Sequence, residues 1–230
     1  MTAARRPAIV SWSGGKDSAL LLQALIASPE YEPAALVTTV TEAYDRVAMH
    51  GVRRALLRTQ AGALRLPLYE AAVPAAADNA TYEAAFARAL STCASRHPTA
   101  HHVAFGDLFL ADVRAYRERL LSELGWKPLF PLWGSDTAQL ARRFVRAGFA
   151  ATICCVDTEQ LDGCWAGRRF DDAFLDALPP GVDPCGERGE FHTFVHDGPI
   201  FAAPLPVRAG ERVLRDGRFQ YCDILPDANR

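Results

Sequence analysis

The sequence predicts an α/β protein in which a parallel sheet covered by helices is followed by a smaller α+β domain. The first observation is that short apolar runs alternate with segments of helical periodicity through the first half of the chain. Such alternation is typical of βαβ units, which build parallel sheets with helices on both faces. The second is a change after Pro128 and Pro131, beyond which the tail reads as short strands separated by Asp-Gly turns. We therefore expect domains over 1–127 and 128–230.

The first domain is expected to alternate strands and helices. The expected strands are short apolar runs at 8–11, 34–40, 68–73 and 103–105. The expected helices carry apolar residues at helical spacing and span 16–27, 49–64, 79–91 and 112–124. Asn79 is the predicted cap of the third helix. Ligands of such Rossmann-like sheets bind at the carboxyl ends of the strands, so the site is expected there.

The second domain is expected to open with a helix and to end in hairpins. Asp136 is the predicted cap of a helix that runs to Ala147, with Gln139 as its reciprocal capping partner. A continuous apolar strand is expected at 149–156 and a short helix at 171–178. Hairpins are predicted to pair 191–195 with 200–201, and 212–214 with 218–222.

The most informative segment is Ser13-Gly14-Gly15-Lys16-Asp17-Ser18, which connects the first expected strand to the first expected helix. Glycines in this position let the backbone approach a phosphate, and the amide groups at a helix start face the anion. Lys16 adds a mobile positive charge, and Asp17 is the candidate ligand for a hydrated Mg2+. The candidate phosphate-binding residues are Ser11, Ser13, Gly14, Gly15, Lys16, Asp17 and Ser18. The segment departs from the G-x-x-x-x-G-K-[ST] loop and predicts a different nucleotide site.

Other polar residues follow the second and fourth expected strands. Thr38, Thr39, Gly106 and Asp107 lie at the same predicted sheet edge as the glycine loop. Thr38, Gly106 and Asp107 are therefore candidate nucleotide-binding residues. Asp107 either helps to bind Mg2+ or caps a helix, and the sequence leaves both alternatives open. His50 is either near the nucleotide or structural.

Composition excludes some classes of protein. The formal net charge of −2 argues against broad binding of nucleic acid. No apolar run approaches the length of a membrane span, and no signal-peptide pattern precedes the first strand, so we expect a cytoplasmic protein without membrane contact. The six cysteines form no C-x-x-C pair and are expected to be free thiols.

Two polar, glycine-containing segments stand out in the second half of the chain. One is Leu161–Arg168, which carries Asp162, Trp165 and Arg168. The other is Asp183–Phe194, in which Glu187 and Glu190 enter a strand together with His192. Gly186 and Gly189 allow tight turns that present the carboxylates to a cationic or amine-bearing substrate. A solvated loop before a hairpin is the alternative reading.

These motifs together resemble one family. The string S-G-G-K-D-S resembles the PP-loop of N-type ATP pyrophosphatases. Together with P-L-W-G at 131–134, L-D-x-x-W-x-G-R at 161–168 and G-E-x-G-E-F-H-T-F-V at 186–195, it is similar to diphthine–ammonia ligase (diphthamide synthase) and its relatives. The resemblance runs from Ile9 to about Phe201. It implies an adenine nucleotide alpha hydrolase-like domain followed by a smaller substrate domain.

The resemblance also implies an activity. The family activates a carboxylate with ATP, and ammonia then displaces AMP to give an amide. On this reading Lys16 and Asp17 act at the departing pyrophosphate with Mg2+, while Glu187 and Glu190 are catalytic. The candidate substrate-binding residues are Asp162, Trp165, Arg168, Glu187, Glu190 and His192. Trp165 has packing as its alternative role, and Arg168 a structural ion pair.

The acceptor and the partners are open. The family substrate is a modified histidine of elongation factor 2, but Arg188 stands where Gly or Asn is usual and Ser135 where relatives often carry a basic residue. The Arg- and Ala-rich composition is typical of a high-GC genome, in which that substrate would be absent if the genome is bacterial. The expected partners are ATP, a carboxylate acceptor and ammonia or an amine. A homodimer is one option for the oligomeric state.

Two other functions are weighed against the ligase. A PP-loop enzyme that thiolates tRNA needs a sulfur-carrying cysteine near the loop, for which Cys93, Cys164 and Cys185 are candidates. An adenine-nucleotide sensor needs only the loop and releases no pyrophosphate.

Overall fold

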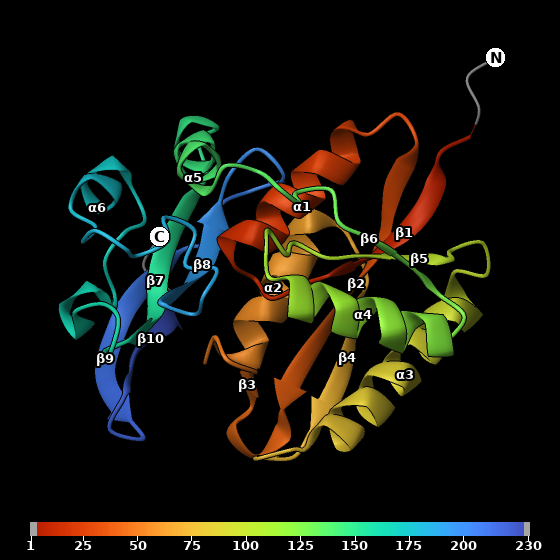
Figure 1. Cartoon of the computed structure of the whole chain (residues 1–230), viewed down its shortest axis with the longest axis horizontal. Coiled ribbons are helices and arrows are strands. Elements are labelled where there is room, and N and C mark those ends of the chain that lie inside the picture. Colours follow the sequence, from red (N-terminus) through yellow and green to blue (C-terminus); the bar gives the residue numbers. More distant parts are fainter. Residues whose placement is uncertain (1–3, 228–230) are drawn as a thin grey trace.

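The computed structural model describes residues 4–227, which form two sheets side by side (Figure 1). The first sheet has six strands, of which five run parallel in the order β4-β2-β1-β5-β6. These are β1 (Arg6–Ser11), β2 (Tyr31–Thr41), β4 (Leu68–Val73), β5 (His102–Ala104) and β6 (Lys127–Leu129). The short β3 (Arg46–Val47) pairs antiparallel with the end of β2. The predicted Rossmann-like parallel sheet is therefore confirmed.

Helices cover both faces of this sheet because successive strand residues point to opposite sides. Val10 and Leu36 face α1 (Lys16–Ala27) and α2 (Arg54–Leu64). Their neighbours Ile9 and Val37 face α3 (Asn79–Arg96) and α4 (Ala111–Glu123). Buried on both sides, β1 and β2 form the centre of the fold.

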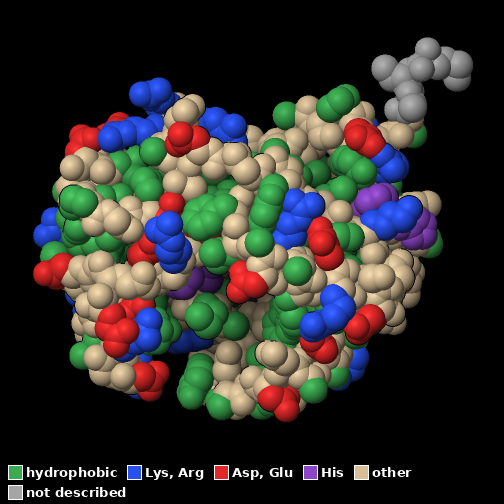
Figure 2. Space-filling model, viewed as in Figure 1, with side chains coloured by type: hydrophobic (Ala, Val, Ile, Leu, Met, Phe, Trp, Pro, Cys, Tyr) green, Lys and Arg blue, Asp and Glu red, His purple; other side chains and the backbone are tan. Residues whose placement is uncertain are grey.

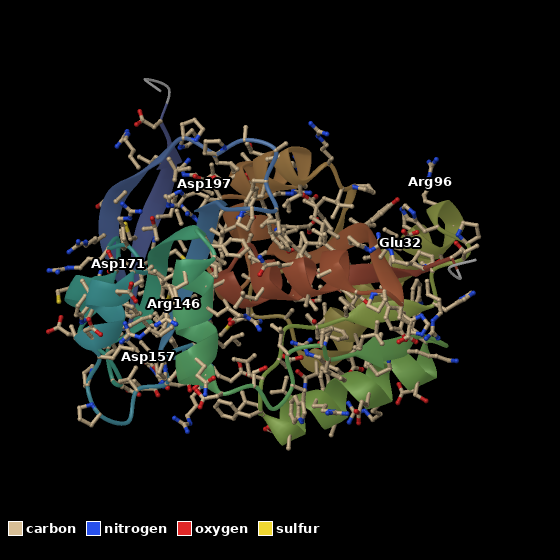
Figure 3. All side chains as sticks on the ribbon, turned by 90° about the horizontal axis from the view of Figure 1, so that it is seen from above. Glu32, Arg96, Arg146, Asp157, Asp171 and Asp197 are labelled. Atoms are coloured by element: carbon tan, nitrogen blue, oxygen red, sulfur yellow. The ribbon has the colours of Figure 1, made fainter. Side chains whose placement is uncertain are left out.

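The second sheet is antiparallel, with the order β8-β7-β10-β9. Its strands are β7 (Ala150–Asp157), β8 (Phe191–Asp197), β9 (Val207–Arg215) and β10 (Phe219–Pro226). The helices α5 (Thr137–Arg146) and α6 (Asp172–Asp176) pack on it, and the short turns η1 (Glu42–Tyr44) and η2 (Gly163–Trp165) complete the elements. Seen from above, Glu32 and Arg96 lie at one end of the molecule, while Asp157 and Asp171 lie at the other (Figure 3). The predicted smaller α+β unit is confirmed.

Most of the expected elements are present, and the exceptions have tertiary causes. The helix expected from Met49 begins only at Arg54, because Gly51 (φ +65°) packs closely against the ring of Tyr221 from the second sheet. The hairpin expected between 191–195 and 200–201 is wrong, since β8 pairs with β7 instead. Asp78, not Asn79, caps α3 by accepting the amide of Thr81 at 2.8 Å.

Other differences are smaller. The sequence did not indicate the strand β6, Lys127–Leu129. The predicted domain boundary between residues 127 and 128 falls within this strand and stays a prediction. The hairpin of β9 and β10 is confirmed. Asp136 caps α5 as predicted, and the Gln139 side chain reaches back to the Asp136 carboxylate.

The two sheets meet where β8 lies against the loop between β1 and α1. The amide of Val195 donates to the carbonyl of Gly14 at 2.9 Å. The fully buried Gln60 of α2 donates to Gly14 O (3.1 Å) and Val195 O (2.5 Å), and accepts from Trp12 Nε1 (3.0 Å). One amide side chain therefore joins α2, the glycine loop and the second sheet.

We expect Gln60→Ala to lower the free energy of unfolding by about 2–4 kcal/mol, because it opens a cavity and leaves the buried indole N–H of Trp12 without its acceptor. Urea denaturation measures this loss. Thr59→Ala, an exposed change on the same helix, is the control and should alter stability by less than about 0.5 kcal/mol. Equal stabilities of the two variants would contradict the role given to Gln60.

Candidate active site

A cavity of about 340 Å3 opens at the carboxyl ends of β1, β2 and β5, where such sheets bind ligands. Residues of the first half of the chain form most of its wall, and Gly186, Glu187 and His192 of β8 close the remainder. The predicted site residues that line it are Ser11, Ser13, Asp17, Ser18, Thr38, Gly106, Asp107, Glu187 and His192. Residues from both halves of the chain therefore converge on one space.

The glycine loop is held by its own side chains and by β8. The hydroxyl of Ser18 donates to Gly15 O at 2.9 Å, and the amide of Gly15 donates to Ser13 Oγ at 3.3 Å. Gly14 has φ +80°, and a Cβ there would lie 2.7 Å from the Gln60 amide oxygen, so both conformation and space require glycine. The amide of Lys16 donates to Thr193 Oγ1 at 3.0 Å. One first-turn amide expected to face an anion is thus used to dock the second sheet.

Lys16 lies in the interior rather than in the cavity. Its Nζ is 2.9 Å from Asp17 Oδ2, donates to the carbonyl of Cys185 and lies 5.3 Å from the centre of the Phe191 ring. Burial by itself lowers the pKa of Lys16, but Asp17, together with Cys185 and Glu187, more than offsets this, and the pKa is raised overall. The lysine is charged and held in place, whereas the sequence predicted a mobile charge.

Asp17 presents one unsatisfied oxygen beside the cavity. Its Oδ2 pairs with Lys16, while its Oδ1 is buried without a hydrogen-bond partner, as is Oγ1 of Thr38. Burial raises the pKa of Asp17, and the Lys16 ammonium offsets part of the rise. A buried, unpartnered carboxylate oxygen costs free energy unless a ligand satisfies it. Such an atom fits a Mg2+ ion, which proteins often hold by one or two carboxylates and the substrate phosphates.

Glu187 reaches the cavity from the segment between α6 and β8. Its Oε1 accepts the amide of Leu108 at 2.7 Å, which fixes the side chain beside the end of β5. Burial raises the pKa of Glu187 to about 7, and the nearby Asp17 and Asp107 carboxylates add to the rise. A carboxyl group that titrates near neutral pH can both take up and release a proton. The structure thus places a potential acid–base group in the cavity.

Two neutral imidazoles form another part of the wall. The rings of His50 and His192 lie 4.6 Å apart, and His50 Nδ1 is 3.3 Å from Thr193 O. Burial lowers the pKa of His50 to about 4 and that of His192 well below its ordinary value. Both rings are therefore uncharged at neutral pH and offer flat, partly apolar surfaces to a ligand.

Asp107 is paired with a residue that the sequence did not single out. Arg117 of α4 lines the cavity, and its Nε and Nη2 donate to the two Asp107 oxygens at 2.6 and 3.1 Å. The N-cap of α4 is Leu110, so the reading of Asp107 as a helix cap is wrong. Arg117 has no motif around it, and only the packing of α4 beside β5 brings it to the site.

Seven predicted site residues are not part of the cavity wall: Lys16 and the loop glycines Gly14 and Gly15, described above, and four residues of the second half. Glu190 is buried and accepts the amides of Asp183 and Arg188, both at 2.9 Å, so it organises its own loop. Asp162 caps η2 by accepting the amide of Cys164 at 2.7 Å. Trp165 packs edge-on against a phenylalanine of α6, and Arg168 lies over its ring at 5.0 Å. Their assigned roles in substrate binding or catalysis stay predictions.

Two features are absent from residues 4–227. No group of three or more His, Cys, Asp or Glu side chains in this range is arranged to hold a metal ion by itself. No helix in the same range is both long and apolar enough to cross a lipid bilayer. On the face drawn in Figure 2, acidic and basic side chains are interspersed.

A Rossmann-like parallel sheet with a glycine-containing loop between β1 and α1, and a cavity at that edge, defines a nucleotide-binding protein of the PP-loop class. Sequence comparison is more specific. Residues 6–128 match the Diphthamide synthase N-terminal domain and residues 136–225 match the Diphthamide synthase C-terminal domain. The chain therefore belongs to the diphthamide synthase family.

Individual relatives are distant. Diphthine–ammonia ligase of Schizosaccharomyces pombe is 26% identical over 206 residues, which is 82% of this chain and 34% of that protein. The human diphthine–ammonia ligase is 32% identical over 111 residues, which is 46% of this chain and 42% of that protein. The chain thus spans about a third of the yeast protein, and its match to the human protein covers less than half of that protein.

Solved structures show weaker similarity. A crystal structure described as a predicted subunit of tRNA methyltransferase from Methanocaldococcus jannaschii is 18% identical, with a TM-score of 0.41. The match covers 64% of this chain and 80% of that chain.

The raised pKa of Glu187 predicts that the contribution of this residue to the free energy of unfolding falls as the pH rises. The folded state keeps a proton on Glu187 up to about pH 7, whereas the unfolded chain releases it near the ordinary value of 4.5. Stability from this group is therefore fully present below pH 4.5 and lost by about pH 7.

Glu187→Gln keeps an oxygen for the Leu108 amide and removes the buried charge. We expect the free energy of unfolding of the variant, relative to that of the wild type, to be higher at pH 8 than at pH 4.5. Urea denaturation at the two pH values measures this change. Glu118→Gln, on the exposed surface of α4, should not show this pH-dependent gain. A constant difference between Glu187→Gln and the wild type would contradict the shifted pKa.

Proposed function

We propose that the protein is an ATP-dependent ligase that activates a carboxylate with release of pyrophosphate and passes it to ammonia, with AMP as the second product. The family and the names of its relatives support the reaction class. The observation that carries the proposal is that Asp17, which has one buried oxygen without a hydrogen-bond partner, lines the same cavity as Glu187, a carboxyl with a pKa of about 7. Pyrophosphate release needs the first group, and ammonia transfer needs the second.

In the first step an oxygen of the acceptor carboxylate attacks the α-phosphorus of ATP. The bond between the α-phosphorus and the bridging oxygen breaks, and pyrophosphate leaves with the bond electrons. The hydroxyls of Ser11 and Ser13, which line the cavity, and the amino end of α1 would donate hydrogen bonds to the departing phosphates. Mg2+ bound through Asp17 Oδ1 would neutralise phosphate charge.

In the second step ammonia attacks the carbonyl carbon of the acyl-adenylate, and AMP leaves. Ammonia is mostly ammonium at neutral pH and must first lose a proton. Glu187 is negatively charged above pH 7, lies in the cavity and can accept that proton. Asp17 and Asp107 add negative charge that attracts ammonium.

The geometry favours the ligase over thiolation of tRNA. Cys185 is the candidate cysteine placed near the loop, but its Sγ donates to Thr137 O at 3.3 Å and burial raises its pKa far above neutral pH. Cys93 is buried with a pKa of about 12, and the pKa of exposed Cys164 is raised by its hydrogen bond with Asp162. A thiol with a raised pKa is a weak nucleophile.

The proposed reaction predicts AMP and pyrophosphate in equal amounts when the protein is incubated with ATP, Mg2+, ammonium and a set of carboxylates that includes diphthine-bearing elongation factor 2. Chromatography of the nucleotides and an enzymatic pyrophosphate assay measure the products. Asp17→Asn should reduce turnover at least about 100-fold, because it removes the charge that holds the metal ion. Formation of ADP would contradict the mechanism, and ATP binding without pyrophosphate release would favour a sensor.

The second step predicts a pH dependence. With ammonium as the amine donor, kcat/KM should rise about tenfold per pH unit below pH 7 and level off above it, because Glu187 must be ionised to accept a proton. In Glu187→Gln the rise of kcat/KM with pH should disappear, and the rate should fall about 100-fold. If the variant keeps the rise of kcat/KM below pH 7, another group takes the proton.

A further inference from the structure

The charges around the cavity are unbalanced. Asp17, Asp107 and Glu187 bring carboxyl groups to its wall. Among the described residues of that wall, Arg117 carries the only permanent positive charge. Lys16 does not line the cavity, because its Nζ is bound to Asp17 and to the carbonyl of Cys185. A polyphosphate entering this space meets repulsion from carboxylates unless a cation compensates for it.

Arg117 is built into the wall in one orientation. Asp107 accepts from Nε and Nη2, and the guanidinium carbon lies 4.4 Å from the centre of the Phe105 ring. Its side chain is 23% exposed, and that of Asp107 is 14% exposed. A guanidinium group has five N–H donors, so the pair with Asp107 leaves others, of which Tyr82, another residue of the cavity wall, accepts a hydrogen bond. Asp107 therefore fixes the plane of Arg117 without using up its donors.

Arg117 is also brought close to the glycine loop. Gly106 packs so tightly on the first turn of α1 that a Cβ there would lie 3.1 Å from the backbone of Asp17. The Phe105–Asp107 segment, which holds Arg117 by an ion pair and a ring contact, therefore abuts the amino end of α1. That end of the cavity is where α1 and the serine hydroxyls favour an anion.

We propose that Arg117 binds the pyrophosphate part of ATP, and that Asp107 is the positioning residue that orients its guanidinium. The inference rests on the proposed binding of ATP at this cavity. The planar guanidinium matches two phosphate oxygens at once, which the ammonium of a lysine cannot do. Arg117 thus provides in the cavity the positive charge that Lys16, in its buried position, does not.

Isothermal titration of the full chain with ATP, pyrophosphate and AMP, each with Mg2+, tests the proposal. Arg117→Lys keeps a positive charge but loses the planar guanidinium that can bind two phosphate oxygens at once. It should weaken the binding of ATP and of pyrophosphate about tenfold. AMP lacks the contacted group and should bind within about twofold of the wild type. Asp107→Asn should show a smaller loss for the same two ligands.

Arg114→Lys is the matched control. Arg114 lies one turn earlier on α4, pairs with Glu118 and stacks on Phe130 and Trp133, but it does not line the cavity. This variant should bind all three ligands like the wild type. Thermal unfolding checks each variant, and if Arg117→Lys is destabilised, the double variant Asp107→Asn, Arg117→Gln removes the whole pair and is titrated instead.

The outcomes separate the two proposals. Unchanged affinity of the Arg117 variants for ATP and pyrophosphate would overturn the inference, as would an equal loss for AMP or for the Arg114 control. Failure of the wild-type protein to bind ATP would instead overturn the proposed function.

Discussion

The docking of β8 against the loop between β1 and α1 is the constraint on which the site depends. Gly14 O receives hydrogen bonds from the Val195 amide and the Gln60 side chain, and the Lys16 amide donates to Thr193. These bonds are buried, so losing any one of them leaves a polar group without water or partner. As a result the loop and the second sheet are held as one unit, and the segment that precedes β8 is placed over the cavity.

This docking also decides the electrostatics of the site. Because the segment before β8 covers Lys16, the ammonium is held by Asp17 and by the Cys185 carbonyl, and it stays charged inside the protein. The same segment brings Glu187 close to Asp17, and the resulting burial raises the Glu187 pKa to about 7. The buried Lys16 ammonium is tolerated because Asp17 pairs with it, whereas the second Asp17 oxygen is buried without a hydrogen-bond partner.

Residues of one sequence motif have different physical roles. In the segment 183–190, Glu187 reaches the cavity, whereas Glu190 accepts backbone amides and stabilises the turns that carry Glu187. Asp162 and Trp165, in the other motif, cap a short turn and pack on α6. Polar residues in a glycine-rich segment can therefore support a site without touching its ligand.

The amino-acid sequence by itself determined the alternation of strands and helices, the glycine loop before α1 and the strand ends that form the cavity edge, because periodicity, capping and turn residues are local signals. It could not determine the pairing of β8 with β7, the late start of α2 or the presence of Arg117 in the cavity. Each of these depends on a contact between distant segments, such as Gly51 with Tyr221 or Arg117 with Asp107. The inward position of Lys16 has the same origin: the loop supplies the lysine, but only the second sheet decides where its charge lies.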